Sequence, residues 1–378
     1  MSEPDVSVVI PCLDEAATVA TVVEKARAGI AAAGLTGEVI VVDNGSTDAS
    51  AERAAAAGAD VVREPRRGYG SAYLAGLERA RGRYVVLADA DDTYDLTRLG
   101  ELLAPLRDGA ALVLGSRFRG RILPGAMPWS HRFIGNPVLT AMLNMLFRVR
   151  VSDAHCGLRA VRREAIPTLA LSATGMEFAS EMVLKAAKRG LRIEEVPIVY
   201  HPRAGESKLN SVRDAWRHIR FMLVHSASFL FLIPGAAAAV GGLVTLGVFA
   251  SEPSFGSHEW GLSVSIASSI VSIVGAQIVQ LGLYARTYAA IYLGDEEPLL
   301  ERAWRRFRLE HGLAIGAAVL VGGIGTAAVS EFNGTSDPRL GLLGLTLVAL
   351  GVQTIFGSFF LSILGLSEHA ILRRRSRR

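Results

Sequence analysis

The chain has 378 residues, half of them hydrophobic, and a formal net charge of +4 at neutral pH. This length gives room for about two domains, and the modest charge without a nucleic-acid-binding motif argues against a nucleic-acid partner. Cys12 and Cys156 are the only cysteines. Because they have neither metal-ligand spacing nor an evident disulfide role, they predict a reducing compartment.

The first 210 residues alternate between strand-like and helix-like segments. Apolar runs predict strands at 6–10, 38–42, 60–63 and 84–88. This alternation favours an α/β fold with a largely parallel sheet, where ligands bind beyond the carboxyl ends of the strands. Asp5 and Asp14 interrupt any apolar run near the start, so no cleavable signal is expected. We expect four polar residues that come after strands to converge: Glu15, Asp43, Arg67 and Asp89.

The stretch 84–95 ends a buried strand in a cluster of acids. Asp89 and Asp91 are two residues apart, so on an extended chain they point the same way. Two such carboxylates repel each other unless a cation lies between them. Hard oxygen ligands suit Mg²⁺ or Mn²⁺, which complete their shell with water and substrate phosphates. The stretch therefore predicts a metal–diphosphate site; the alternative is a solvated loop or a helix N-cap at Asp92.

Two arginine-rich segments are candidates for anion binding. Arg66 and Arg67 precede a loop with glycines at 68 and 70, which is either a phosphate-binding loop or a solvated rim. The lack of Gly-x-Gly-x-x-Gly and of a Walker lysine disfavours a dinucleotide fold and a P-loop enzyme. Three further arginines come after a predicted strand at 110–114 and suggest anion capture, with surface solvation as the alternative: Arg117, Arg119 and Arg121.

Segment 129–148 runs from amphipathic to apolar, carries Arg132, and has a pattern typical of a helix on a membrane surface. His155 is expected to be a packed histidine. On a predicted helix at 176–189, Glu177 and Glu181 share a face. Like charges at this spacing destabilise a helix unless one of them has a use elsewhere in the protein.

The chain becomes strongly apolar beyond residue 226. Four runs each reach the roughly 18 residues needed to cross a bilayer, with predicted spans of about 229–250, 261–285, 312–330 and 340–366. Arginines gather at 286–311 and in the tail, which predicts a cytoplasmic position for both segments and for the N-terminal domain. The predicted organisation is a globular domain at 1–210, a juxtamembrane amphipathic helix at 211–228 and a transmembrane domain at 229–378.

Seven motifs, in order, resemble family 2 glycosyltransferases of the GT-A fold, specifically the polyprenyl-phosphate (dolichol-phosphate) hexose synthases. The resemblance covers roughly residues 5–225. The matching motifs are SVVIPCLDE at 7–15, VVDNGSTD at 41–48, GYG at 68–70, DAD at 89–91, GSR at 115–117, DAHCGLR at 153–159 and RAGESK at 203–208. Three residues depart from the common pattern: Asp14, Asn44 and Thr93 stand where Asn, Asp and Gln are frequent. The first two departures leave the choice of nucleotide open, and the third leaves open which groups complete the coordination shell of the metal.

The resemblance implies a role for each motif. Nucleotide contacts fall to Pro11, Glu15, Asp43, Gly68 and Asp89. The implied metal ligand is Asp91, assisted by Asp89. Phosphates of donor and acceptor would meet Arg117, Arg132, Arg203, Ser207 and Lys208. Asp153 and Glu177 are candidates for orienting the sugar, and no catalytic base is assigned.

The implied reaction is inverting, metal-dependent transfer of a hexose from a nucleotide sugar to a membrane polyprenyl phosphate. UDP-glucose is favoured over GDP-mannose, partly on the Gly-Ser-Thr-Asp form of the second motif. The implied location is a cell (inner) membrane. Two alternatives remain: a polymerising polysaccharide synthase, and a non-catalytic adaptor or flippase component. The first is disfavoured because no Gln-x-x-Arg-Trp motif precedes the spans, and the second by the full set of acids. The sequence leaves the oligomeric state open, a homo-oligomer included.

Overall fold

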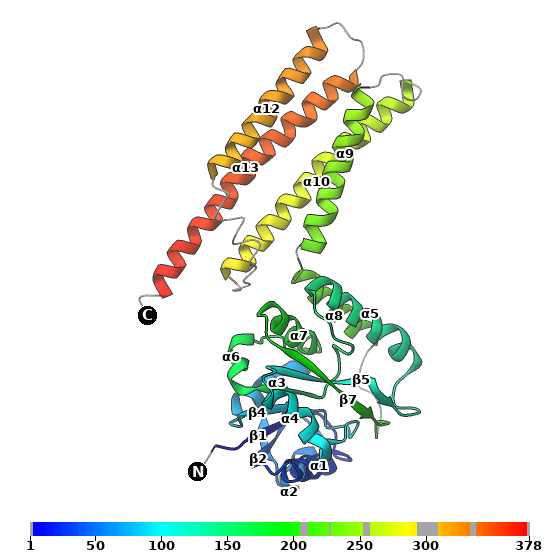
Figure 1. The fold of residues 1–378 in the computed structure, drawn as a ribbon, viewed down its shortest axis with the longest axis vertical. Coiled ribbons are helices and arrows are strands. Elements are labelled where there is room, and N and C mark those ends of the chain that lie inside the picture. Colours follow the sequence, from blue (N-terminus) through cyan, green and yellow to red (C-terminus); the bar gives the residue numbers. More distant parts are fainter. Residues whose placement is uncertain are drawn as a thin grey trace. The chain divides into compact units, whose positions relative to one another are not determined.

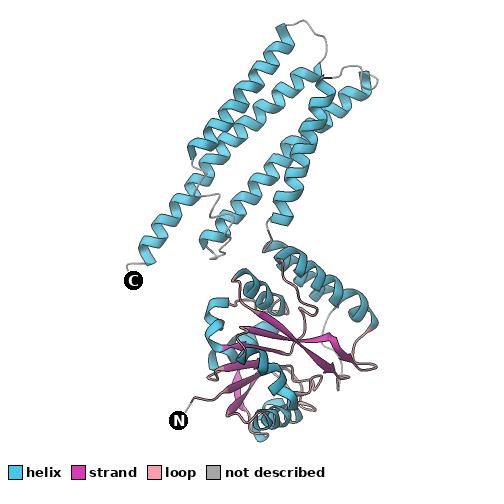
Figure 2. Ribbon diagram, in the orientation of Figure 1, coloured by secondary structure: helices cyan, strands magenta, loops and turns pink. Residues whose placement is uncertain are grey.

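A computed structural model of the protein describes residues 3–204, 211–226, 228–251, 258–292, 309–332 and 338–375. They form two compact units, Met1–Met222 and Leu223–Arg378. The first is an α/β domain and the second is helical (Figures 1 and 2). The division falls inside helix α8 (Ser211–Val224), so most of the segment predicted as an amphipathic helix belongs to the first unit.

The first unit is built on a seven-stranded sheet of order β3-β2-β1-β4-β6-β5-β7. Among the described strands only β6 runs antiparallel to its neighbours, β4 and β5; the other pairings are parallel. This confirms the predicted α/β fold with a mostly parallel sheet. The strands are β1 (Val6–Cys12), β2 (Gly37–Asp43), β3 (Asp60–Arg63), β4 (Tyr84–Leu87), β5 (Leu112–Ile122), β6 (Arg159–Arg162) and β7 (Ile193–Tyr200).

Helices cover both faces of this sheet. The alternation of side chains along β1 sets the two layers: Val8 and Ile10 pack into one apolar cluster with α1 and α4, and Val9 packs into the other with α3, α5 and α7. The helices of this unit are α1 (Val19–Ala32), α2 (Ser50–Ala56), α3 (Tyr69–Arg79), α4 (Leu99–Arg107), α5 (Asn136–Phe147), α6 (Ile166–Leu169), α7 (Phe178–Lys188) and α8. Short helical turns are η1 (Leu96–Arg98), η2 (His131–Gly135) and η3 (Arg163–Ala165).

The fifth strand is longer than predicted. The apolar run ends near residue 114, but β5 continues to Ile122, so the arginines at 117, 119 and 121 lie on the strand and not beyond its end. The extension is held by β7, which pairs Ser116 with Pro197 and Arg121 with Val199 across an irregularity in register. Along this extension Arg117 is buried, whereas Arg119 and Arg121 are exposed.

The second unit contains η4 (Ser228–Leu232), α9 (Ile233–Ser251), α10 (His258–Tyr292), α12 (Leu309–Phe332) and α13 (Pro338–Arg375). Within the described residues, four helices are long and apolar enough to cross a membrane: Phe229–Ser251, Gly261–Tyr288, Leu309–Phe332 and Pro338–Leu364. This confirms the four predicted transmembrane helices. Small residues let backbones approach closely, as where a Cβ on Gly242 would lie 2.6 Å from the Ser268 carbonyl oxygen. Ser269 and Thr346 share a 2.7 Å hydrogen bond between α10 and α13.

Candidate functional site

The sheet brings the polar motifs to one edge. Strands β1, β2 and β4 run parallel and end there, at Cys12, Asp43 and Leu87. Because β6 runs the other way and pairs Leu87 with Arg159, the segment that leads into β6 arrives at the same edge. The acids after β4 therefore lie against the 153–159 motif, at the end of the sheet where α/β proteins bind ligands.

Asp89 is held by two tyrosines from helix α3. Its Oδ1 accepts a hydrogen bond of 2.8 Å from Tyr69 and a longer one of 3.4 Å from Tyr73. Its Oδ2 lies so close to Gly157 that a Cβ there would approach to 2.2 Å. Burial raises the pKa of Asp89 to about 6, and the charge of Asp91 adds to the rise. A nearby cation would relieve both effects.

Asp91 is oriented by its own loop. Its Oδ1 accepts hydrogen bonds from the Thr93 backbone N–H at 3.2 Å and from the Thr93 hydroxyl at 2.7 Å. Its Oδ2 lies 3.5 Å from Nη1 of Arg203, whose Nη2 is ion-paired with Glu15. The acids therefore sit together with Arg203. Asp92 instead forms an ion pair with Lys25. The N-cap of the next helical turn is Asp95, whose side chain accepts a hydrogen bond from the Thr97 N–H. The alternative prediction of a helix N-cap at Asp92 is therefore wrong.

The residues present fit a divalent cation. Asp89 and Asp91 offer hard carboxylate oxygens, and the raised pKa of Asp89 reflects the cost of placing both in one buried edge. Among the described residues no group of three His, Cys, Asp or Glu side chains could hold a metal ion. A pair of carboxylates matches Mg²⁺, which typically takes one or two carboxylates and completes its shell with water and substrate phosphates.

The second motif shapes a loop beside the acids. Asp43 is buried at the end of β2 and accepts a hydrogen bond from the Ser46 N–H. The Asn44 amide donates to the carbonyls of Glu64 and Arg66 and accepts from the Gly68 N–H, each within 2.9 Å. An aspartate could not donate those two bonds, so Asn44 fixes the loop that carries Gly68. The glycine itself has φ of 147°, and a Cβ there would collide with the Thr174 carbonyl.

The first motif comes after β1 and contacts the second. Pro11 lies on β1 opposite Val42 of β2. One oxygen of the Asp14 carboxylate, Oδ1, accepts hydrogen bonds from the Thr47 N–H at 2.6 Å and from the Thr47 hydroxyl at 3.0 Å, and the amide oxygen of an asparagine could accept both as well. The next residue, Glu15, reaches Arg203. Pro11, Glu15 and Asp43 are thus brought to one edge, and their nucleotide contacts remain predictions.

Arg117 and Asp153, predicted separately, are partners. The Arg117 Nε and Nη2 donate to the two Asp153 oxygens at 2.7 and 2.8 Å, and both side chains are buried. The guanidinium also lies 5.2 Å from the ring centre of Tyr200. Behind them, Glu195 accepts hydrogen bonds from Ser152 and from the Asp153 N–H. The pair is therefore fixed in place.

Arg132 lies on the turn η2, away from the strands. It is exposed, its guanidinium lies 5.3 Å from the ring centre of Phe133, and Trp129 beside it is 67% exposed. The exposed apolar side chains continue onto α5 with Val138 and Met145. This surface fits the predicted membrane-facing segment.

The two glutamates of α7 have different surroundings. Glu181 is buried, pairs with Lys185 and accepts hydrogen bonds from the Ser172 and Ala173 N–H groups, so it is used to hold the loop packed on Gly68. Glu177 stands at the N-cap, and its buried Oε2 has no hydrogen-bond partner. An unsatisfied carboxylate oxygen is consistent with a contact to a ligand hydroxyl.

Ser207 and Lys208 lie outside the described residues. Sequence reasoning missed Tyr69, Tyr73 and Glu195. The tyrosines have a readable signal, since two tyrosines four apart at the start of a helix share one face. Glu195 has none, because its role depends on a pairing with a segment 43 residues earlier.

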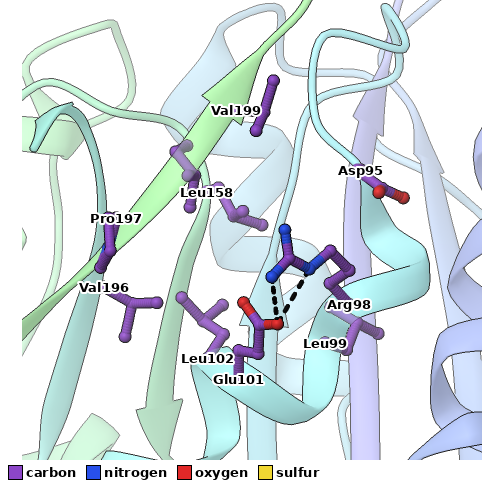
Figure 3. Close-up of a pocket in the computed structure, with 10 residues that line it drawn as sticks. Asp95, Arg98, Leu99, Glu101, Leu102, Leu158, Val196, Pro197 and Val199 are labelled. Atoms are coloured by element: carbon purple, nitrogen blue, oxygen red, sulfur yellow. Dashed lines mark hydrogen bonds and ion pairs between the residues drawn. The ribbon is translucent and has the colours of Figure 1, made fainter. Parts of the chain in front are cut away.

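A small cavity of about 40 Å³ lies elsewhere, between β7 and α4. Figure 3 shows its mostly aliphatic lining, with Arg98 and Glu101 paired to each other at one side. Its polar lining groups are thus already engaged, and the chemistry is better placed at the acid edge.

Comparison with known proteins agrees with this geometry. Residues 7–169 match the family model "Glycosyl transferase family 2", and residues 283–365 match "Glycosyltransferase family 2 C-terminal transmembrane region". The low-salt glycan biosynthesis hexosyltransferase Agl6 of Haloferax volcanii is 40% identical over 96% of this chain and 89% of its own. A dolichyl-phosphate hexose transferase of the same organism is 38% identical over 46% of this chain and 74% of its own.

Among solved structures, a mycobacterial protein matches 59% of this chain and 75% of its own, with a TM-score of 0.50 and 25% identity. The alignment with Agl6 spans both units, so it supports the whole architecture and not only the α/β domain. The chain therefore belongs to glycosyltransferase family 2, with a GT-A domain followed by a transmembrane region.

Proposed function

We propose that this glycosyltransferase moves a hexose from a nucleotide sugar to a polyprenyl phosphate in the membrane, with inversion at the anomeric carbon. The observation that carries the proposal is the cluster of Asp89, Asp91 and Arg203 at the ligand-binding edge of a sheet, in a chain with four membrane-spanning helices. The names of two relatives, a hexosyltransferase of glycan biosynthesis and a dolichyl-phosphate hexose transferase, support it.

On the donor side, Pro11, Glu15, Asp43 and Gly68 hold the nucleoside, and Asp89 and Asp91 hold Mg²⁺ or Mn²⁺. When bound, the ion neutralises charge on the leaving diphosphate. The chain's own part is orientation. Tyr69 and Thr93 fix the two carboxylates from behind, so that each presents one oxygen without rearrangement during the reaction.

On the acceptor side, the nucleophile is a phosphate oxygen. The second pKa of a phosphate monoester is about 6, so the group is largely ionised at neutral pH and needs no dedicated base. Its oxygen forms the bond to the anomeric carbon while the bond to the nucleoside diphosphate breaks, which inverts that carbon. Asp153 is engaged by Arg117 and therefore positions this arginine rather than accepting a proton. The contacts to the phosphates of donor and acceptor are proposed for Arg117, Arg132, Arg203, Ser207 and Lys208.

The site's surroundings suit a lipid acceptor. Trp129 and Phe133 are exposed beside Arg132, and on α8 the exposed Trp216 accompanies Arg213 and Arg217. Aromatic and basic side chains together are typical of segments at a membrane interface. Arginines gather in the segment 286–311 and in the tail of the sequence, so by the positive-inside rule we assign the catalytic domain to the cytoplasmic face of a cell (inner) membrane.

The test is a donor panel with the full chain in lipid nanodiscs, Mn²⁺ or Mg²⁺, and a short-chain polyprenyl phosphate. We expect transfer from UDP-glucose, with GDP-mannose as the alternative, and a product of inverted anomeric configuration. Asp91→Ala should abolish transfer and leave membrane insertion intact, whereas the neighbouring Asp92→Ala, which loses only the pair with Lys25, should remain active. Equal activity of both variants would remove Asp91 from the mechanism.

A further inference from the structure

Arg203 joins acids from two different motifs. It lies three residues beyond the end of β7, yet its guanidinium pairs with Glu15 after β1 and lies 3.5 Å from Oδ2 of Asp91 after β4. The three side chains are largely buried, at 22%, 13% and 12% exposure. The resemblance assigned Arg203 to the phosphates of donor and acceptor without choosing between them, and its contacts in the structure are with acids assigned to the donor side.

The bonding of Asp91 leaves one oxygen for two cations. Thr93 takes Oδ1 through its N–H and its hydroxyl, so Oδ2 is the oxygen left for an ion, and Arg203 faces that same oxygen. A positive guanidinium and a divalent ion repel each other at such a distance. The ion can therefore bind Asp91 well only when Arg203 withdraws.

The guanidinium also has an unused donor. Its Nε is buried and has no hydrogen-bond partner in the structure. Buried N–H groups are costly when unpaired, and a phosphate oxygen is the acceptor that an arginine fork pairs with best. A diphosphate held beside Asp91 would offer Arg203 that partner in exchange for the carboxylate.

We propose that Arg203 competes with the divalent ion for Asp91, and that a nucleoside diphosphate ends the competition by taking the guanidinium. The inference rests on the proposed metal–diphosphate site. Ion and diphosphate both favour the arrangement in which Arg203 has left Asp91, so each tightens the binding of the other. The enzyme is thereby biased to load the ion together with the nucleotide and not alone.

The test measures binding, not turnover. The full chain in nanodiscs is titrated with Mn²⁺ alone by electron paramagnetic resonance of the free ion, and with UDP or GDP by calorimetry with and without Mn²⁺. The ratio of the two nucleotide affinities is the coupling factor. For Arg203→Gln we expect Mn²⁺ alone to bind at least about tenfold tighter. If Arg203 leaves Asp91 in only about one molecule in ten of the wild type, the apparent affinity for Mn²⁺ is about tenfold lower than in a variant without the guanidinium. The coupling factor should fall by a similar amount.

Three variants complete the design. Arg98→Gln removes the same charge from the distant pair with Glu101 and should change neither quantity. Asp91→Asn should lose the Mn²⁺ signal, which locates the ion. Arg203→Lys keeps the positive charge but loses the planar set of guanidinium donors. Its Mn²⁺ affinity should lie between those of wild type and Arg203→Gln. This variant therefore tests the competition even if Arg203→Gln does not fold.

Unchanged or weaker Mn²⁺ binding in both Arg203 variants, with wild-type coupling, overturns the inference and leaves the proposed function standing. If the wild type binds Mn²⁺ neither alone nor with either nucleotide, the proposed metal site fails and the inference fails with it.

Discussion

The hydroxyl of Tyr69 donates a 2.8 Å hydrogen bond to Oδ1 of Asp89. Tyr69 is the first residue of α3 and comes directly after Gly68, whose N–H is held by Asn44. The loop between β3 and α3 thus acts on the acid edge through a tyrosine as well as through its glycines. Tyr73, one turn later, stacks on Phe178 at 5.2 Å and reaches the same oxygen at 3.4 Å.

Tyr69→Phe should weaken Mn²⁺ binding and transfer by about 10- to 100-fold, the usual effect of losing a group that orients a metal ligand. The hydrogen bond from Tyr69 lowers the pKa of Asp89 against the effect of burial, so its loss also leaves less of the carboxylate ionised near pH 6. Tyr73→Phe keeps the stacked ring and removes only the longer bond, and should cost much less. Equal losses in the two variants would contradict this ranking.

Gly157→Ala tests the packing behind Asp89. The new Cβ would lie 2.2 Å from Asp89 Oδ2 and 3.0 Å from the Tyr94 hydroxyl, so the carboxylate must move. We expect transfer to fall at least about 100-fold, with a destabilisation of about 1–3 kcal/mol, as for other overpacked sites. Gly100→Ala is the control, because its Cβ meets its nearest atom at 3.7 Å and lies on a helix. Transfer activity and thermal unfolding are measured for both variants. Retained activity in Gly157→Ala would show that Asp89 tolerates displacement.

Asp153→Ala should be among the most destabilising single changes in the catalytic domain. It leaves Arg117 buried without its bidentate partner, and breaking such a pair costs about 3–5 kcal/mol. Removing both charges with Arg117→Met and Asp153→Leu should restore much of the unfolding temperature while transfer stays lost. Arg119→Ala, on an exposed side chain 3.5 Å from Glu195, is the control and should melt close to wild type. Additive losses in the double variant would mean that the two residues do not act as a pair.

The fold and the acid edge could be predicted because both depend on local patterns. Apolar runs define the strands, and parallel strands bring the residues after their carboxyl ends to one edge, so the position of Asp89 and Asp91 at that edge could be predicted, while their role as metal ligands stays a prediction. The antiparallel β6 could not be read, because its direction is set by pairing with β4 and not by its four residues. The same holds for β5, whose extension depends on β7.

Side-chain partners far apart in sequence were also out of reach. Arg203 is 188 residues from Glu15, and spacing alone cannot show whether an arginine meets a ligand phosphate or a protein carboxylate. Arg117 and Asp153 illustrate the same limit, because each was assigned a separate role although they bind each other.

The two buried histidines predict how stability depends on pH. Ser180 Oγ lies 3.1 Å from His155 Nε2 and 2.7 Å from His218 Nδ1, which ties α8 to the 153–159 motif. Burial lowers the pKa of His218 to about 4 and that of His155 well below its usual value, with Arg159 contributing to both.

Because an unfolded histidine has a pKa of about 6.5, the unfolded state binds more protons than the folded state as the pH falls from 6.5 towards 4. Stability is therefore lost on acidification through that window. The double variant His155→Gln, His218→Gln keeps polar groups beside Ser180 but cannot titrate. Between pH 7 and pH 5 its unfolding temperature should fall less than that of the wild type. Asp89, whose raised pKa acts in the opposite direction, is common to both proteins and cancels in the comparison. An equal fall in unfolding temperature between pH 7 and pH 5 for the wild type and the double variant would show that the histidines are not buried as neutral groups.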